Sequence, residues 1–409
     1  MRICIVTESY IRGGIDTFLI SLINGWPLGK DEFTIYINSE HLGTEYIAEK
    51  IDKSIKIITY KNFTTRISHI LNQQKSTKGK LLRYKITSRL LLLYESTFFL
   101  AWRIIKDTVK FRKSDFDRLL VVNGGYPGGL NCRSALIGWK IAGKKPLGVM
   151  NFHSYYTKPR PSRILLESIS NILVAKSIDT LVSVSKDCLE SLSNEQFFRT
   201  VKFKQVIYNG IADPGDAIIR KSAPGLKDHS YCIMIGSYEK HKGHNFLLKA
   251  FHIAQTQIPN LKLLVYGDGD ITDLKKIETE IQNSNLENQV ELYSFNDNVK
   301  EVLRNSSILL VPSQGLESFG LTIIEAMSMR IPVVATNVGG IPEVLGDNCG
   351  GYICSKDDPA QFASRIVQII SDPDLAVKIG DAGRKRFEEI FTNHKMSEKY
   401  STLLHSECR

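Results

Sequence analysis

The chain has 409 residues, of which 43% are apolar and 23% are charged. This length suits two domains of ordinary size, and this composition excludes a mainly disordered protein. No uncharged apolar run reaches roughly 18 residues, so no membrane-spanning helix is expected. The N-terminal strand-like residues are interrupted by Glu8 and do not resemble a signal peptide. Seven cysteines without a CxxC pair favour free thiols in a reducing cytoplasm.

The net charge of +10 is concentrated in one segment. Residues 61–113 carry 13 lysines and arginines against two acids, whereas the rest of the chain carries 40 basic and 41 acidic residues. Apolar residues interleave with the basic ones in a helical pattern. Two compatible interpretations follow: a helix packed on a sheet with a solvated basic face, and an amphipathic surface on anionic lipid. The proposed membrane contacts are Lys78, Lys80, Arg83, Lys85 and Arg89.

Strand-like and helix-like segments alternate along most of the chain. Many strand candidates are continuous runs of Val, Ile and Leu, which are typical of parallel strands buried on both faces. The predicted strands are 2–7, 33–37, 118–122, 146–152, 180–184, 205–208, 231–235, 262–266, 290–293, 307–311 and 332–336. Helical patterns such as 245–258 and 320–329 lie between them. The repeated strand–helix units predict an α/β fold with doubly wound parallel sheets.

A domain boundary is predicted where this alternation stops. Residues 212–230 hold two prolines, two glycines and mixed charge with little periodicity, and a new series of strand–helix units begins at residue 231. We expect Rossmann-like domains at 1–212 and 213–390, and a last helix in 391–409 that returns to the N-terminal domain. Ligands of open α/β sheets bind beyond the carboxyl ends of the strands, so a cleft between the domains is the expected site.

The strongest local signal lies between residues 311 and 354. A buried strand ends at residue 311, a glycine-containing loop with Glu317 follows, and a helix that opens near Phe319 and Gly320 carries Glu325 in its second turn. The first backbone N–H groups of such a helix favour an anion or sugar hydroxyls. The eight-residue spacing suits two carboxylates that hold different parts of one polyhydroxylated ligand. The alternative is a pair of surface acids at a helix start.

Three weaker signals lie at other strand ends. Lys240, His241 and Lys242 stand between a strand that ends at Gly236 and a helix, where phosphates bind in such folds. Gly13 and Gly14 precede the first helix and allow close approach of a ligand, although they form no dinucleotide-binding GxGxxG. His153 ends a central strand. Each signal alone is also compatible with an ordinary turn or a structural residue.

Together, in this order, these pieces resemble retaining glycosyltransferases of family 4, which have the GT-B fold of two Rossmann-like domains. The family's E-x7-E motif is present as Glu317 and Glu325, and the downstream PVVATNVGGIPEV at 332–344 is the most specific match. The segments VSKDCLESL and IYNGI also match. The resemblance implies an N-terminal acceptor domain, a C-terminal donor domain, no cofactor and no metal, the nucleotide-sugar being a substrate.

The resemblance also implies roles for individual residues. Glu325 would hold the ribose hydroxyls of the nucleotide-sugar, and Lys242 would contact the diphosphate. Glu317, with the backbone of Ser318, Phe319 and Gly320, would hold the donor sugar. His153 would lie near the reacting sugar, and Gly14 would allow approach of the diphosphate or acceptor. Further donor contacts are expected at Gly236 and Ser237.

Two positions depart from the family pattern. Ser237 stands where the family usually has an arginine that pairs with the diphosphate, and Arg330 stands where a glycine is common. A charge-assisted hydrogen bond is worth about 1.5–3 kcal/mol, so loss of that arginine weakens donor binding unless Lys240 compensates.

The resemblance predicts transfer of a sugar to a hydroxyl of a glycan or lipid-linked glycan, with UDP favoured over GDP as the donor nucleotide. The expected setting is capsule, O-antigen or another bacterial surface polysaccharide, on the cytoplasmic face of an anionic membrane. Alternatives are a non-catalytic membrane-associated homologue and a nucleotide-sugar epimerase. The Asp268-Gly269-Asp270 sequence could indicate a metal-dependent transferase, but it also suits a turn. No motif indicates a nucleic-acid partner.

Overall fold

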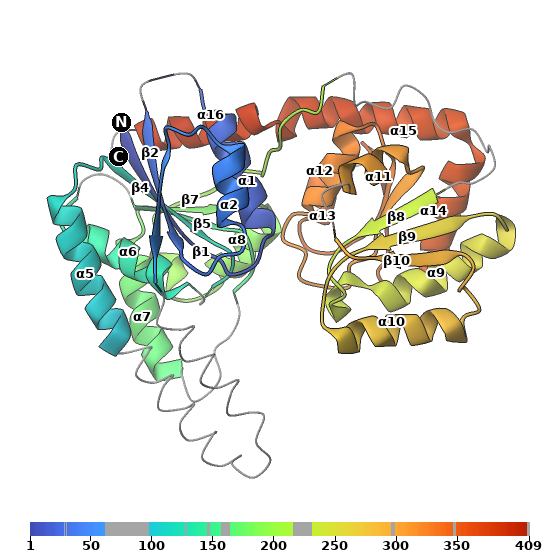
Figure 1. Cartoon of the computed structure of the whole chain (residues 1–409), viewed down its shortest axis with the longest axis horizontal. Helices are drawn as coiled ribbons and strands as arrows, with labels where there is room; N and C mark the ends of the chain where they lie inside the picture. The colour runs from blue at the N-terminus through green and yellow to red at the C-terminus, as the bar shows by residue number, and fades with distance from the viewer. Residues whose placement is uncertain are drawn as a thin grey trace, which may run out of the picture. The chain divides into compact units, whose positions relative to one another are not determined.

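The computed structural model describes residues 1–27, 29, 31–61, 98–126, 129–144, 148–156, 164–215, 231–295, 299–346 and 349–406. The chain forms two compact units (Figure 1). The first unit contains Met1–Ile207 together with Ser397–Arg409, and the second contains Tyr208–Met396. Both units are built from a parallel sheet with helices packed against it.

The described part of the first unit contains a seven-stranded sheet in the order β3-β2-β1-β4-β5-β6-β7. In that order the strands are Lys56–Tyr60, Glu32–Asn38, Arg2–Glu8, Arg118–Asn123, Gly148–Phe152, Thr180–Ser183 and Phe203–Val206. All neighbouring pairs are parallel. The apolar runs of β1 and β4 are buried at the centre, as expected for strands covered on both faces.

Helices cover this sheet and close the unit. They are α1 (Gly14–Asn24), α2 (Thr44–Lys50), α5 (Leu100–Lys113), α6 (Leu130–Ile141), α7 (Ile164–Ser177) and α8 (Lys186–Ser193). The C-terminal helix α16 (Asn393–His405) joins them from Ser397 onward. Ser397 Oγ donates to the Leu22 carbonyl at 2.8 Å, and Arg118 Nε donates to the Leu404 carbonyl at 2.5 Å. These bonds fix the end of the chain to α1 and β4.

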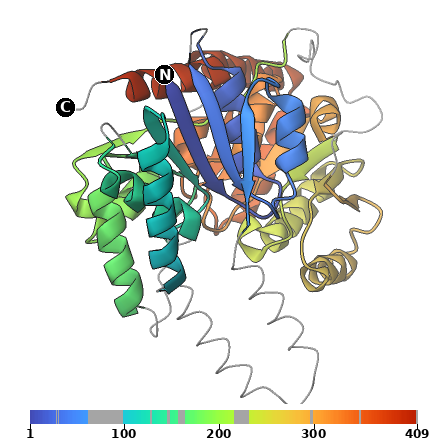
Figure 2. The ribbon, with the colours of Figure 1, turned by 60° about the vertical axis from the view of Figure 1, so that its left-hand side comes forward.

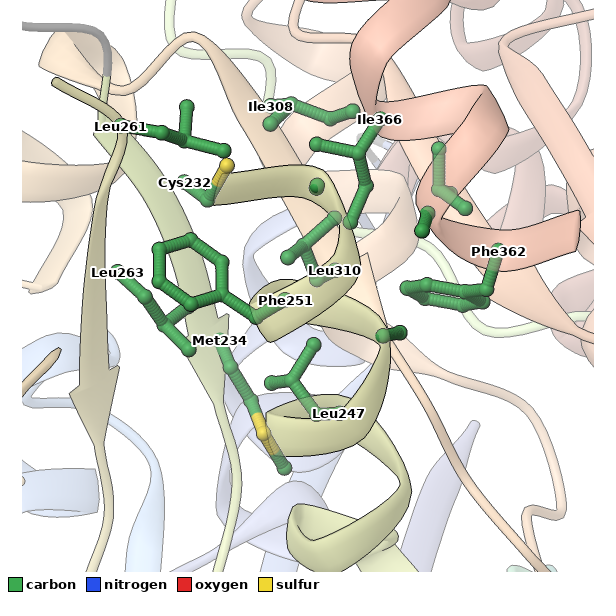
Figure 3. Close-up of a cluster of buried hydrophobic side chains, with 14 of the residues drawn as sticks. Cys232, Met234, Leu247, Phe251, Leu261, Leu263, Ile308, Leu310, Phe362 and Ile366 are labelled. Atoms are coloured by element: carbon green, nitrogen blue, oxygen red, sulfur yellow. The ribbon is translucent and has the colours of Figure 1, made fainter. Parts of the chain in front are cut away.

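The second unit contains, within its described residues, a six-stranded sheet in the order β10-β9-β8-β11-β12-β13. Its strands in that order are Val290–Tyr293, Lys262–Tyr266, Tyr231–Ile235, Ile308–Val311, Val333–Thr336 and Gly351–Cys354. Its helices are α9 (His244–Gln257), α10 (Ile271–Asn283), α11 (Val299–Asn305), α12 (Leu321–Ser328), α13 (Ile341–Leu345), α14 (Pro359–Ser371) and α15 (Pro373–Arg386). Helices α9 and α14 lie against the sheet, where Phe251, Phe362 and Ile366 form one buried cluster with Cys232 and Leu310 (Figure 3).

The predicted doubly wound α/β fold is confirmed in both units. Two edge strands, β3 and β13, were not predicted, because their sequences KIITY and GYIC are short and interrupted by polar residues or glycine. Strand β7 begins two residues before the predicted segment. In each sheet the strand order reverses beside the first strand, between β1 and β4 and between β8 and β11. These are the positions where ligands bind in doubly wound sheets.

The structure gives a physical reason for one unusual residue. Arg330 has a φ of +60°, in the left-handed region that glycine adopts without strain. Its guanidinium forms an ion pair with Asp381 of α15. The Arg330 carbonyl oxygen would lie 2.3 Å from a Cβ placed on Gly380, so the backbone here packs closely on α15. The arginine therefore keeps a turn that is better suited to glycine.

Candidate donor-binding site

Two loops at the switch point of the second sheet carry most of the predicted donor-site residues. One runs from Gly236 through a short 3-10 helix, Lys240–Lys242, to α9, and the other runs from the end of β11 to α12. Gln314 N donates to the His241 carbonyl at 2.7 Å, which joins the loops. Gly243 has a φ of +82°, and a Cβ there would lie 1.9 Å from the Pro312 carbonyl oxygen. Only glycine permits this close approach.

Lys242 and Glu317 meet where these loops touch. Lys242 Nζ lies 2.7 Å from Glu317 Oε2, and the two side chains are 25% and 12% exposed. Ser313 Oγ donates to the same carboxylate oxygen at 3.1 Å, while Gly340 N donates to the Glu317 carbonyl at 2.9 Å. The structure thus brings two of the predicted residues into one half-buried ion pair, 75 positions apart in the sequence. The pair thus places the ammonium group of Lys242 beside the carboxylate oxygens of Glu317, which can accept hydrogen bonds.

The helix that follows Glu317 begins where the sequence indicates. Gly320, with a φ of +89°, precedes α12, and no side chain caps the first turn of this helix. The ring of Phe319 is buried and packs against Tyr208 and Phe391. The first N–H groups of α12 lack intrahelical partners, as at every helix start. Ser318 lies between Glu317 and this aromatic anchor, so the backbone that would hold a donor sugar is positioned by packing.

Glu325 lies one turn further along α12. Its side chain is half-buried, and within the described residues its carboxylate has no hydrogen-bond or ion-pair partner. Burial raises the pKa of Glu325 above its usual value, and the nearby charge of Lys300 opposes this shift. A half-buried carboxylate without a partner in the described chain is free to accept hydrogen bonds from water or from ligand hydroxyls. Glu317 and Glu325 therefore have different surroundings and do not act as a shared-proton pair.

Ser237 does not replace the charge of an arginine. Its Oγ donates to the Glu239 carboxylate at 2.9 Å. Gly236 lies beside the Lys242 stem, since a Cβ there would be 3.7 Å from Lys242 Cδ. Lys240 is exposed, and in the described part of the chain no carboxylate pairs with it. Lys242 is thus held in place by its ion pair, whereas the exposed side chain of Lys240 is free to change its conformation.

His153 and Gly14 belong to the first unit. Asn151 Nδ2 lies 2.9 Å from His153 Nε2, and the Phe18 ring of α1 meets the imidazole edge-on at 4.5 Å. Burial lowers the pKa of His153 to about 3, so the imidazole is neutral near pH 7. It can exchange hydrogen bonds with a substrate there, but it does not supply a positive charge.

The loop before α1 is held by residues that the sequence analysis did not identify. Asp16 accepts a hydrogen bond from Gly13 N at 3.1 Å and pairs with His41 Nε2 at 2.7 Å. Both side chains are buried. Asp16 is the third residue of α1, which is a recognisable capping position, but nothing in the sequence indicates His41 as its partner. Ser313 was missed for the same reason.

The remaining predictions have mixed outcomes. Asp270 accepts from Thr272 N at 2.8 Å and caps α10, as expected for a turn. Lys78, Lys80, Arg83, Lys85 and Arg89 lie outside the described residues, and of segment 61–113 the structure describes residue 61 and residues 98–113. Among the described helices, none is both long and apolar enough to cross a membrane.

The second sheet is doubly wound, and the Lys242–Glu317 ion pair lies at its switch point, where ligands of such folds bind. Residues 216–386 match the family model of the glycosyl transferases group 1. It is 31% identical over 238 residues to the N-acetyl-alpha-D-glucosaminyl L-malate synthase of Bacillus anthracis, covering 56% of this chain and 60% of that protein.

Two further similarities concern a second relative and a solved structure. The capsular polysaccharide biosynthesis glycosyltransferase CapM of Staphylococcus aureus is 31% identical over 192 residues, which are 44% of this chain and 48% of CapM. The alignments thus span less than two thirds of either relative. The crystal structure of Anabaena Alr3699/HepE in complex with UDP superposes with a TM-score of 0.72, at 17% identity, over 99% of both chains. This likeness shows that the whole chain has the same fold, the predicted GT-B fold.

Proposed function

We propose that this protein is a retaining glycosyltransferase that moves a sugar from a nucleotide-sugar to a hydroxyl of a glycan or lipid-linked glycan. The observation that carries the proposal is the Lys242–Glu317 pair at the β8–β11 switch point, with Glu317 in the loop that leads into the helix of Glu325. The match of residues 216–386 to the group 1 glycosyl transferase model and the likeness to the glycosyltransferase CapM support the reaction class. UDP is favoured as the nucleotide because the Anabaena protein of the same fold binds UDP.

Each of the predicted residues contacts a different part of the nucleotide-sugar. Lys242 and the N-terminal turn of α12 stabilise the negative charge that develops on the departing diphosphate, a task that needs fixed positive groups. Glu325 accepts hydrogen bonds from the ribose hydroxyls. Glu317 and the backbone at Ser318, Phe319 and Gly320 hold the sugar. Lys240 is the residue that we expect to replace the missing arginine at Ser237.

The proposed step needs no protein nucleophile. The bond between the anomeric carbon and the diphosphate oxygen breaks as the sugar gains oxocarbenium character. The acceptor hydroxyl attacks from the face that the diphosphate leaves, and a diphosphate oxygen takes the hydroxyl proton. The products are the glycoside with retained configuration and the nucleoside diphosphate. Neutral His153 contributes a hydrogen bond near the reacting sugar, and Gly14 allows the substrate to approach α1.

The pathway and location are proposed on the same basis. The likeness to CapM supports a role in bacterial surface polysaccharide synthesis, and O-antigen synthesis is an equally suitable pathway. The acceptor would be reached at the cytoplasmic face of an anionic membrane, where the basic segment 61–113 would bind. Metal-independent transfer follows from the assignment of charge stabilisation to Lys242 and the helix.

The test is a panel of UDP- and GDP-sugars with a lipid-linked acceptor, in buffer with EDTA, and with NMR of the product anomer. Transfer with retained configuration supports the proposal. Conversion of a nucleotide-sugar without any acceptor would indicate an epimerase. Donor binding without turnover for every sugar and acceptor tested would indicate the non-catalytic homologue.

A further inference from the structure

Two helices of the first unit present an apolar surface to solvent. On α5 and the residue pair before it, Phe98, Trp102, Ile105 and Val109 are between 46% and 72% exposed. Their spacing of four, three and four residues places them on one helix face. Scattered exposed apolar residues are ordinary, but a continuous stripe of large ones marks a contact surface.

Helix α7 also presents large apolar side chains to solvent. Ile169, Ile172 and Leu173 are 54%, 47% and 43% exposed. Both α5 and α7 pack against α6, in which Asn131–Trp139 are all buried. Figures 1 and 2 both show α5 and α7 as neighbouring rods on the same side of the unit. We term these residues together the α5–α7 face, made of Phe98, Trp102, Ile105, Val109, Ile169, Ile172 and Leu173.

The charges around this face have one sign. The exposed charged residues of the two helices are all basic, namely Lys106, Arg112, Lys113 and Lys176. Each helix contains one acid, and both acids are buried. Asp107 pairs with Lys110 at 3.0 Å and accepts from Ser134 Oγ at 2.7 Å, and Glu167 pairs with Arg133 at 2.6 Å. The solvent-facing sides of α5 and α7 therefore combine large apolar groups with cations and expose no carboxylate.

We infer that the α5–α7 face docks on an anionic lipid surface, with Trp102 and its apolar neighbours inserted among the headgroups. Lys106 lies over the Trp102 ring, with Nζ 5.2 Å from its centre, which is a typical pairing at a membrane interface. Apolar insertion with basic attraction is the pattern of interfacial helices. The inference deepens the proposed function by assigning the membrane partner to residues distinct from Lys78–Arg89. It also predicts binding that high salt weakens but does not abolish.

The experiment compares two double variants by co-sedimentation with phosphatidylcholine vesicles that do or do not contain phosphatidylglycerol. Trp102→Ser with Ile105→Ser removes two side chains of the face. The matched control, Ile271→Ser with Val377→Ser, removes apolar groups that are 61% and 43% exposed in the second unit. The wild type and the control should bind the anionic vesicles, and the face variant should bind at least tenfold more weakly. The single variant Ile105→Ser keeps Trp102, so its binding can also be followed by the blue shift of tryptophan fluorescence on addition of vesicles. Weaker binding should make this shift smaller than in the wild type.

Failure of the inference and failure of the proposed function give different results. Equal vesicle binding by the face variant, or no binding by the wild type, would overturn the inference. A wild-type dimer that the face substitutions dissociate would assign the face to a second copy of the chain and also overturn it. UDP-induced thermal stabilisation, measured on the same variants, should be unchanged. Vesicle binding without nucleotide binding would leave the face standing while the transferase proposal fails.

Discussion

Substitution of Glu317 should strengthen the binding of free UDP, which is the opposite of what removal of a ligand contact would do. In the structure the Lys242 ammonium is held 2.7 Å from the Glu317 carboxylate. A diphosphate that binds Lys242 must therefore compete with this carboxylate. Glu317→Gln keeps the shape of the side chain and its bond from Ser313, but it removes the competing charge. Free UDP lacks the sugar that Glu317 would hold, so it loses nothing in exchange.

The size of the effect follows from the surroundings of the pair. The side chains are 25% and 12% exposed, so the pair lies between a surface ion pair and a buried one. Release of about 1 kcal/mol would tighten UDP binding about fivefold. Lys242→Met removes a charge-assisted hydrogen bond to the diphosphate of about 1.5–3 kcal/mol and should weaken UDP binding about tenfold to a hundredfold.

Titration calorimetry with UDP, and with GDP in parallel, measures these effects in the wild type, both single variants and the double variant. Glu317→Gln should have no effect once Lys242 is methionine, because no cation remains to be released. Turnover should fall in both single variants. If Glu317→Gln weakens UDP binding, and its effect adds to that of Lys242→Met, Glu317 contacts the nucleotide itself and the assignment of roles is wrong.

Three further predictions concern single residues. Donor affinity should fall as the pH is lowered toward the raised pKa of Glu325, because a protonated carboxyl loses an acceptor for the ribose. Glu325→Gln should bind more weakly at pH 7 and lack this dependence in calorimetry. Unfolded His153 takes up a proton below about pH 6.5, whereas the folded residue, with a pKa of about 3, does not. The free energy of unfolding therefore decreases as the pH falls. Between about pH 6.5 and 4.5, urea unfolding should show a decrease about 2 kcal/mol smaller in His153→Asn than in the wild type. Arg330→Gly should be about 1 kcal/mol more stable than Arg330→Ala, since both variants lose the Asp381 ion pair but only alanine keeps the left-handed strain. Equal midpoints of urea unfolding for the two variants would show that the turn relaxes.

The parts of the fold that rest on local pattern were predictable. The runs LLVY and ILLV are continuous apolar segments, and the structure places them as the buried strands β9 and β11. The start of α12 at Gly320 also follows from the sequence, because a glycine-containing loop precedes an apolar helical repeat. The edge strand β3 was missed because half of its short sequence faces solvent and its pattern is weak.

Long-range pairings were not predictable from one sequence. The spacing of Glu317 and Glu325 indicated separate tasks, but nothing in it indicated that Lys242 would reach Glu317. That contact depends on Gly243, whose missing side chain lets the loop meet the Pro312 carbonyl. Likewise, Arg330 departs from the family pattern in sequence, whereas its left-handed backbone and its bond to Asp381 are visible only in the folded chain.

The most direct test of the donor site is a crystal structure of the protein with UDP. The account predicts that Lys242 Nζ leaves Glu317 and lies within hydrogen-bond distance of a diphosphate oxygen, with the ribose hydroxyls on the Glu325 carboxylate. UDP bound elsewhere, with the Lys242–Glu317 pair intact and Glu325 without a ligand, would contradict it.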